Sequence, residues 1–262
     1  MAVHNSDLVI CIGARFDDRS TGGVFDKFAP DANVIHIDID PSTINKNIKV
    51  HCPVVGDAKS VISQLDESIP LTFKPDKAER DKWFTQIKEW ESTHPTVANQ
   101  KGKVIKTSYA IDTLSKITKG KAVVVTDVGQ HQMWVAQYYQ FENPRNQITS
   151  GGLGTMGFGF PAAIGAKLGR PKDMVLAVCG DGSFQMNMQE FSTAVENNLD
   201  LKIILINNGH HGMVRQWQTL FFNKNYSCCK FDLNPDYVKI ATSYGAKSFK
   251  IDSPKHLEAS IR

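Results

Sequence analysis

Two polar positions in the second half of the chain are suited by type and surroundings to hold a cation. Asp181, with a glycine on each side, comes just after the apolar residues 174–179, and Asn208 is the second of two asparagines that follow the apolar residues 201–206. Such runs are typical of buried strands, and ligands of open α/β sheets bind at the carboxyl ends of the strands. A carboxylate and an amide oxygen together suit Mg²⁺, which is often bound with phosphate groups. The pattern therefore predicts a site for Mg²⁺ and a phosphate.

Two other interpretations of these residues remain open. Asp181 and Asn208 are also typical of turns that cap helices. Separately, Gly152, Gly154 and Gly157 match the dinucleotide fingerprint, with Asp181 roughly the expected distance downstream, so a nicotinamide-dependent dehydrogenase is an alternative. The weak strand pattern before Gly152 and the position of Pro161, where the phosphate-binding helix should start, count against the dehydrogenase.

Strand and helix patterns alternate along the chain, which predicts an α/β fold with a mostly parallel sheet in a three-layer domain. Residues 70–107 are polar and mixed, with one helix expected at 79–91, and this stretch resembles an interdomain connection. The expected strands are 7–13, 33–38, 122–127, 174–179, 201–206 and 247–251, and the other expected helices are 57–65, 108–118, 130–140, 161–168, 186–197, 213–220 and 235–243.

Composition limits the classes of function. The chain has 262 residues, 41% hydrophobic and 22% charged, with a net charge of only +3. These values are ordinary for a globular protein, and without long basic runs they favour neither nucleic acid nor a membrane as partner. The 5 cysteines have no metal-ligand spacing, which fits a reducing compartment. The chain runs almost at once into the expected strand at 7–13, and residues 254–261 resemble a helix that is cut short, so we expect a piece of a longer protein.

Several blocks of sequence together resemble one enzyme family. Beyond the Asp181–Asn208 motif, which is similar to the thiamine diphosphate and Mg²⁺ motif of thiamine-dependent enzymes, the chain resembles the acetolactate synthase (acetohydroxyacid synthase) large-subunit family from one end to the other. The blocks that carry this resemblance are 13–19, 36–41, 56–58, 129–134, 150–157 and 212–218. The resemblance implies a partial Rossmann-like central domain at 1–75, a linker at 76–107, and a C-terminal thiamine diphosphate-binding domain at 108–262 that is truncated at its end.

The resemblance also implies residue roles around thiamine diphosphate. Mg²⁺ would be held by Asp181, the Asn208 side chain and the backbone carbonyl of His210. The diphosphate and the aminopyrimidine would be contacted by Gln130, His131, Gly154, Met156, Gly182, Ser183 and Met213, with Met156 bending the cofactor. The substrate side would be formed by Met213, Val214 and Trp217, although the spacing of these three also suits ordinary helix packing.

In the first domain the resemblance implies FAD with a structural role and no net redox chemistry. Arg15 suits a diphosphate by its charge, and Asp38 suits a ribose hydroxyl. We expect FAD binding to weaken if contacts upstream of residue 1 are missing. The residues that would contact FAD are Gly13, Ala14, Arg15, Asp38, Ile39, Asp57 and Ala58.

The implied reaction decarboxylates pyruvate and condenses the two-carbon product with a second 2-ketoacid, pyruvate or 2-ketobutyrate, in branched-chain amino-acid synthesis. No glutamate of this chain lies in the context of the family's activating glutamate, which belongs to an N-terminal domain, so we assign no catalytic residue and expect the chain to be inactive alone. The family also implies a homodimer or higher oligomer and a regulatory small subunit, in the cytoplasm of bacteria or in a mitochondrion or plastid. The chain could also be a pyruvate oxidase, a glyoxylate carboligase, an oxalyl-CoA decarboxylase or a non-catalytic cofactor-binding module.

Overall fold

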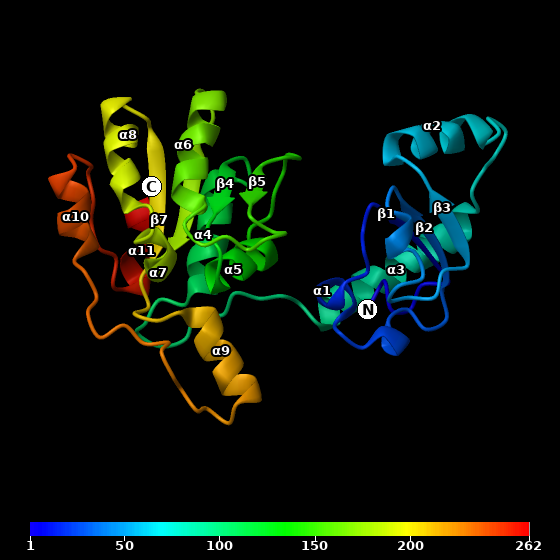
Figure 1. The fold of residues 1–262 in the computed structure, drawn as a ribbon, viewed down its shortest axis with the longest axis horizontal. Helices are drawn as coiled ribbons and strands as arrows, with labels where there is room; N and C mark the ends of the chain where they lie inside the picture. The colour runs from blue at the N-terminus through cyan, green and yellow to red at the C-terminus, as the bar shows by residue number, and fades with distance from the viewer. Residues whose placement is uncertain (262) are drawn as a thin grey trace. The chain divides into compact units, whose positions relative to one another are not determined.

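The computed structural model describes residues 1–261, which form two compact units that divide between Pro95 and Thr96. The first unit is built on a three-stranded parallel sheet in the order β1-β2-β3 (Figure 1). Its strands are β1 (Leu8–Ile12), β2 (Asn33–Asp38) and β3 (Cys52–Val55), its helices are α1 (Asp18–Thr21), α2 (Ala58–Ser68) and α3 (Lys77–Thr93), and its 3₁₀ turns are η1 (Phe25–Lys27) and η2 (Pro41–Thr43).

Side-chain caps fix where the helices of the first unit begin. The Asp57 carboxylate accepts a hydrogen bond from the backbone of Ser60 at the start of α2, and Asp76 caps α3 in the same way. Such caps satisfy backbone N–H groups that a helix end leaves unpaired. The predicted strand at 33–38 and both predicted helices are confirmed. Strand β3 is not predicted, because its four residues begin with the unpromising pair Cys52-Pro53.

The second unit holds a four-stranded parallel sheet in the order β5-β4-β6-β7, so the predicted α/β class is confirmed. Its strands are β4 (Val123–Thr126), β5 (Gln147–Thr149), β6 (Val175–Gly180) and β7 (Leu201–Ile206). Its helices are α4 (Thr107–Thr118), α5 (Gln130–Tyr138), α6 (Gly159–Gly169), α7 (Asp181–Phe184), α8 (Phe191–Glu196), α9 (Gly212–Phe221), α10 (Tyr237–Ser243) and α11 (Pro254–Ile261), with the 3₁₀ turn η3 (Met188–Glu190).

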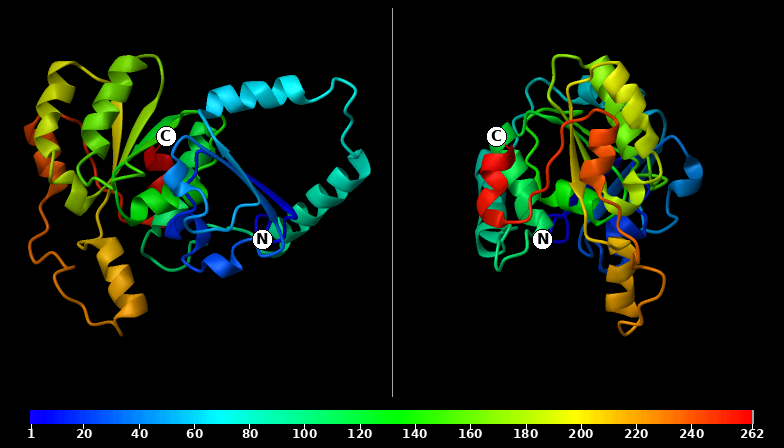
Figure 2. Two further views of the ribbon diagram at one scale, coloured as in Figure 1. Left: turned by 45° about the vertical axis from the view of Figure 1, so that its right-hand side comes forward. Right: turned by 90° about the vertical axis from the view of Figure 1, so that its left-hand side faces the viewer.

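Both faces of the central strands of this sheet are buried. Val123, Val125 and Val175 pack on one face against α6, α7, α8 and α10, whereas Val124 and Leu176 pack on the other face against α4, α5 and α11. Uninterrupted apolar strands are typical of parallel sheets covered on both sides, and this pattern gives the unit its three layers (Figure 1). Helix α9 projects away from these layers beyond the end of β7 in all three views (Figure 2).

The structure corrects three local predictions. Residues 247–251 form no strand and pair with no described strand, so β7 remains an edge strand of the sheet. The helix predicted at 186–197 is broken into η3 and α8, preceded by the short helix α7. Pro161 lies within the first turn of α6, where its missing N–H costs nothing, so it does not argue against a helix start after the glycines. No helix within residues 1–261 is both long and apolar enough to cross a membrane.

Candidate functional site

A pocket lies at the carboxyl edge of the sheet of the second unit, where β4, β6 and β7 end. It gathers most of the residues predicted to hold a metal ion and a diphosphate. The residues lining it are Val128, Gly129, Gln130, His131, Trp134, Met156, Gly180, Asp181, Gly182, Ser183, Ile206, Asn208, His210, His211 and Gly212. The pocket thus combines residues from the three connections that follow β4, β6 and β7, as expected for a ligand site at the carboxyl ends of parallel strands.

The Asp181 carboxylate joins the end of β6 to the loop after β7. It is 2% exposed, and it accepts hydrogen bonds from the backbone N–H groups of Gly182 at 2.9 Å, Asn208 at 3.0 Å and Gly209 at 2.6 Å. On its other side, the Tyr237 hydroxyl donates to the Asp181 carbonyl at 3.2 Å, and burial raises the pKa of Tyr237 to about 12. These bonds hold the Asp181 carboxylate in one orientation in the pocket wall.

Asn208 and His210 complete the predicted metal-binding set in the same loop. The Asn208 side-chain oxygen accepts from the His210 backbone N–H at 2.9 Å, and the His210 imidazole bonds both to the Asn208 carbonyl and to Arg215. Residues 1–261 hold no cluster of three or more His, Cys, Asp or Glu side chains that could bind a metal. A cation here would therefore rely on one carboxylate and neutral oxygens, a donor set suited to Mg²⁺ that shares its shell with phosphate and water.

His131 offers the clearest sign that this pocket fits a phosphate group. Its ring is buried, and within residues 1–261 its Nε2 atom has no hydrogen-bond partner. A Cβ at Gly129 or Gly180 would come within 3.0 Å or 2.9 Å of the ring atom Cε1, so glycine at both positions makes room for the imidazole. Buried polar atoms are almost always hydrogen-bonded. An unpaired imidazole nitrogen at this pocket therefore suits the oxygen-rich group that the sequence predicts.

Burial lowers the pKa of His131 to about 4, with the charge of Asp127 opposing the shift. We therefore expect acid to destabilise the ligand-free protein. Between pH 6.5 and 4 the unfolded chain takes up a proton that the folded chain does not bind, so stability falls as pH falls. From pH 7 to pH 5 this corresponds to a loss of about 2 kcal/mol.

The measurement compares denaturant unfolding of the wild type and of His131→Gln at pH 7 and pH 5. The other histidines contribute equally to both proteins, so they cancel in the comparison. We expect the variant to lose about 2 kcal/mol less than the wild type over this interval. Equal losses in the two proteins would contradict a buried, neutral His131.

Of the remaining predicted residues of the second unit, some line this pocket and others lie outside its lining. Gln130 faces the start of α9, where its Nε2 donates to the Gln216 side chain at 2.7 Å. Met156 lines the pocket, whereas Gly154 lies in the same glycine-rich segment but outside the lining. Met213, Val214 and Trp217 lie on α9, also outside the lining, although α9 begins at Gly212, which lines the pocket. Val214 and Trp217 are exposed, and Trp217 packs against Phe221.

The first unit places the seven residues predicted for FAD at one edge of its sheet. Gly13, Ala14 and Arg15 follow β1, Asp38 and Ile39 lie at the end of β2, and Asp57 and Ala58 follow β3. Because the three strands are parallel neighbours, these loops share the carboxyl edge. Arg15 is exposed there, paired only loosely with Asp17 at 3.7 Å. An exposed guanidinium and a buried carboxylate, Asp38, at the same edge of the sheet are a donor set suited to a dinucleotide.

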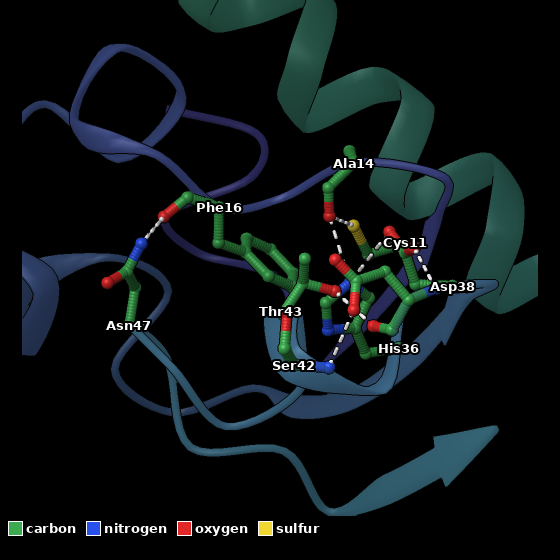
Figure 3. Close-up of polar contacts among 9 residues, drawn as sticks. Cys11, Ala14, Phe16, His36, Asp38, Ser42, Thr43 and Asn47 are labelled. Atoms are coloured by element: carbon green, nitrogen blue, oxygen red, sulfur yellow. Dashed lines mark hydrogen bonds and ion pairs between the residues drawn. The ribbon is translucent and has the colours of Figure 1, made fainter. Parts of the chain in front are cut away.

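Two buried side chains, Cys11 and His36, hold the loop after β1 by hydrogen bonds, and sequence reasoning does not single them out. Figure 3 shows His36 and Cys11 pointing toward Ala14, whose carbonyl accepts from His36 Nε2 at 2.9 Å and from Cys11 Sγ at 3.1 Å. Phe16 packs edge-on against the His36 ring and takes a positive φ of 50°. A residue in that conformation persists only when its surroundings fix it. The loop that carries Arg15 is therefore preorganised.

Sequence reasoning also misses Asp127, Gly129, Trp134, His211 and Gly212 in the second unit. Asp127 directly follows the apolar strand β4, so the rule that selects Asp181 at the end of β6 also applies to it. The two glycines give no such signal: at Gly129 the space is taken by the His131 ring two residues later, and at Gly212 it is taken by side chains distant in sequence. For example, a Cβ at Gly212 would come 2.3 Å from the Gln130 side-chain oxygen.

Comparison with known proteins identifies the family. Residues 127–262 match the family model described as thiamine pyrophosphate enzyme, C-terminal TPP binding domain, and residues 1–65 match the model of the central domain of the same enzymes. The whole chain is 44% identical to 46% of the acetolactate synthase large subunit of Buchnera aphidicola subsp. Schlechtendalia chinensis and 43% identical to 46% of the isozyme 3 large subunit of Escherichia coli. It is also 41% identical to 39% of the mitochondrial acetolactate synthase catalytic subunit of Saccharomyces cerevisiae.

The chain therefore spans less than half the length of these relatives. The glycine-rich segment does lie between β5 and α6, as a dinucleotide fingerprint would, but the matches favour neither a nicotinamide-dependent dehydrogenase nor a thiamine enzyme other than the synthase. The family model covers the pocket and most of its sheet, and the homologues cover the entire chain. The chain therefore belongs to the thiamine pyrophosphate enzyme family and is homologous to acetolactate synthase large subunits.

Proposed function

We propose that this chain forms the central and cofactor-binding part of an acetolactate synthase catalytic subunit. The reaction removes CO₂ from pyruvate and joins the remaining two-carbon unit to a second 2-ketoacid, pyruvate or 2-ketobutyrate, at the first common step of branched-chain amino-acid synthesis. The observation that carries this proposal is the pocket where the buried Asp181 carboxylate and the unpaired His131 Nε2 lie together. Homology to large subunits along the whole chain supports it.

Each group of pocket residues has a proposed task toward thiamine diphosphate. Asp181, the Asn208 side chain and the His210 carbonyl would bind Mg²⁺, and Gly154 and Met156 would hold the aminopyrimidine. When bound, the cofactor supplies the nucleophilic carbon and the electron sink that decarboxylation requires. The diphosphate would be bound by Gln130, His131, Gly182 and Ser183, with Met213 beside the cofactor. We place the glutamate that activates the pyrimidine outside residues 1–262.

We propose that the start of α9 forms the substrate side of the pocket. Met213, Val214 and Trp217 would contact the acceptor 2-ketoacid, with the indole of Trp217 narrowing the space available to it. The exposure of Val214 and Trp217 leaves their surfaces free for such a contact. Closure of a helix over a bound ligand excludes water from the reacting groups.

We further propose that FAD binds at the carboxyl edge of the first unit, in a structural role. The Arg15 guanidinium would bind its diphosphate, and Asp38 a ribose hydroxyl, while Gly13, Ala14, Ile39, Asp57 and Ala58 would line the rest. The support for this proposal is the preorganised loop above His36 and the exposed charge of Arg15. A chain that holds only part of the FAD contacts would bind FAD weakly.

The proposed partners follow from the same homology. A catalytic subunit of this kind would act as a homodimer or larger homo-oligomer and would bind a regulatory small subunit. We propose a cytoplasmic location if the source is bacterial, and a mitochondrial or plastid location if it is eukaryotic. The yeast relative is a mitochondrial protein.

A chimera tests the function. Residues 1–262 would replace the matching segment of the Escherichia coli isozyme 3 large subunit, which is 43% identical. We expect the chimera to form acetolactate from pyruvate, and the 262-residue chain alone to bind thiamine diphosphate with Mg²⁺ but to form none. Absence of cofactor binding by the chain would refute the proposed pocket. A chimera that binds the cofactor but releases acetate or acetaldehyde instead would assign the chain to another thiamine enzyme.

A further inference from the structure

A second buried carboxylate lies next to the pocket and is not used in the proposed chemistry. Asp127 follows β4 and is fully buried, and its backbone N–H donates to the Val178 carbonyl of the neighbouring strand at 2.9 Å. Its carboxylate accepts from the backbone N–H groups of Val128 at 2.8 Å, Gly157 at 3.0 Å and Gly159 at 3.0 Å. Asp127 thereby connects the end of a central strand to the glycine-rich segment 30 residues later.

The same segment is held from the opposite side by Asn187. The Asn187 side-chain amide donates to the Gly157 carbonyl at 2.7 Å, so the N–H of Gly157 is bound by one side chain and its C=O by another. The contacts are also tight. A Cβ at Gly159 would come 2.6 Å from the Asp127 backbone nitrogen, and a Cβ at Gly157 would come 2.8 Å from the Asn187 amide. We refer to Asp127 and Asn187 as the Gly157 clamp.

The Gly157 clamp adjoins two walls of the pocket. Met156, which lines the pocket, directly precedes the clamped residue. The backbone of Asp127 is also a hydrogen-bond partner of the His131 imidazole, which lines the pocket from α5. A site holds its ligand well only when the groups around it lock its contact residues in place. The clamp satisfies this condition for both walls.

We propose that Asp127 and Asn187 are positioning residues that hold Met156 in the pocket wall and so set the affinity for thiamine diphosphate. This inference rests on the proposed function. Neither side chain lines the pocket, so the effect acts through the backbone of residues 156–159. A buried carboxylate whose bonds all come from backbone N–H groups cannot be replaced by an amide without loss, because an amide has only one acceptor oxygen.

The experiment uses the whole chain and two clamp variants, Asp127→Asn and Asn187→Ala. Hydrogen exchange in the segment 150–159 reports whether the clamp holds the backbone, with or without any ligand. Titration calorimetry with thiamine diphosphate and Mg²⁺ reports the affinity. We expect Asp127→Asn to speed exchange in this segment at least tenfold and to weaken binding about tenfold. Asn187→Ala removes the hydrogen bond to the Gly157 carbonyl, and we expect it to speed exchange and weaken binding about threefold. This second variant still tests the proposal if Asp127→Asn does not fold.

The matched control is Asn146→Asp. Asn146 is equally buried in the same unit but lies before β5, where it bonds to the Lys121 carbonyl and to Arg170. The Asn146→Asp variant should have a lower melting temperature than the wild type, with unchanged affinity for thiamine diphosphate and unchanged exchange in residues 150–159. Unchanged exchange and affinity in both clamp variants would overturn the proposal, as would an equal loss of affinity in the control. If the wild type binds no thiamine diphosphate, the proposed function fails, while the exchange result still decides whether the clamp positions the segment.

Discussion

Replacing Asp181 by alanine is expected to weaken Mg²⁺-dependent binding of thiamine diphosphate at least ~100-fold. Asp181 is the only acidic residue among the described residues that line the pocket. Two opposite unit charges about 4 Å apart near a protein surface attract by about 4 kcal/mol, and about 1.4 kcal/mol corresponds to a tenfold change in affinity. Removing the carboxylate also leaves the N–H groups of Asn208 and Gly209 without their acceptor.

The measurement is titration calorimetry of the cofactor with and without Mg²⁺. Asp181→Asn loses the charge that attracts the cation but keeps one acceptor oxygen for the N–H groups of Asn208 and Gly209, at the cost of the bond from Gly182, so it removes the charge with less damage to the loop than alanine does. Asp200→Ala is the control, since Asp200 is exposed and precedes β7, at the opposite edge of the sheet from the pocket. The control should bind as the wild type does. Wild-type affinity in Asp181→Ala would mean that the cation is held elsewhere.

Two glycines of helix α6 are expected to respond in opposite ways to alanine. Gly159→Ala would place a Cβ 2.6 Å from the backbone nitrogen of Asp127 and 2.8 Å from its Cα, where no flexible side chain can move aside. Overpacking of this kind costs about 3 kcal/mol. Gly165→Ala, in the same helix, has no described atom within 4 Å of the new Cβ. It should stabilise the protein by about 1 kcal/mol through helix propensity alone.

Denaturant unfolding of the two variants measures the difference. Because both substitutions add the same methyl group to one helix, the propensity gain cancels in the comparison, and a gap of about 3 kcal/mol between them measures the steric contact with Asp127. Similar stabilities in the two variants would show that α6 can shift away from Asp127 without cost. In that case the Gly157 clamp would not be rigid either.

The strand ends and their polar residues could be predicted because they depend on local sequence. The apolar run before Asp181 marks a buried strand wherever it occurs, and parallel neighbours then bring Asp181 and Asn208 to one edge. The apolar alternation at 247–251 has the same local signal, yet these residues join no sheet and β7 remains an edge strand. Local sequence cannot show which strand lies at the edge.

The parts of the site that could not be predicted depend on contacts between distant residues. The burial of His131 depends on Gly180 in the next strand of the sheet, and the role of Asp127 depends on Gly157, 30 residues later. Likewise, the helical spacing of Met213, Val214 and Trp217 predicts α9 but not that the helix projects beyond the sheet (Figure 2). A sequence pattern specifies an element and its faces, whereas tertiary packing decides which face meets the pocket.

The strand order β5-β4-β6-β7 also links ligand binding to folding. The pocket draws residues from the ends of β4, β6 and β7, so any opening of the sheet separates its walls. Parallel strands pair only after long crossovers close, which makes such sheets slow to form. A ligand that binds only the closed sheet stabilises it by about 2.7 kcal/mol at a concentration 100 times its Kd. Thiamine diphosphate would thus stabilise the folded second unit after its sheet has formed. Newly made protein would resist proteolysis longer when the cofactor is plentiful.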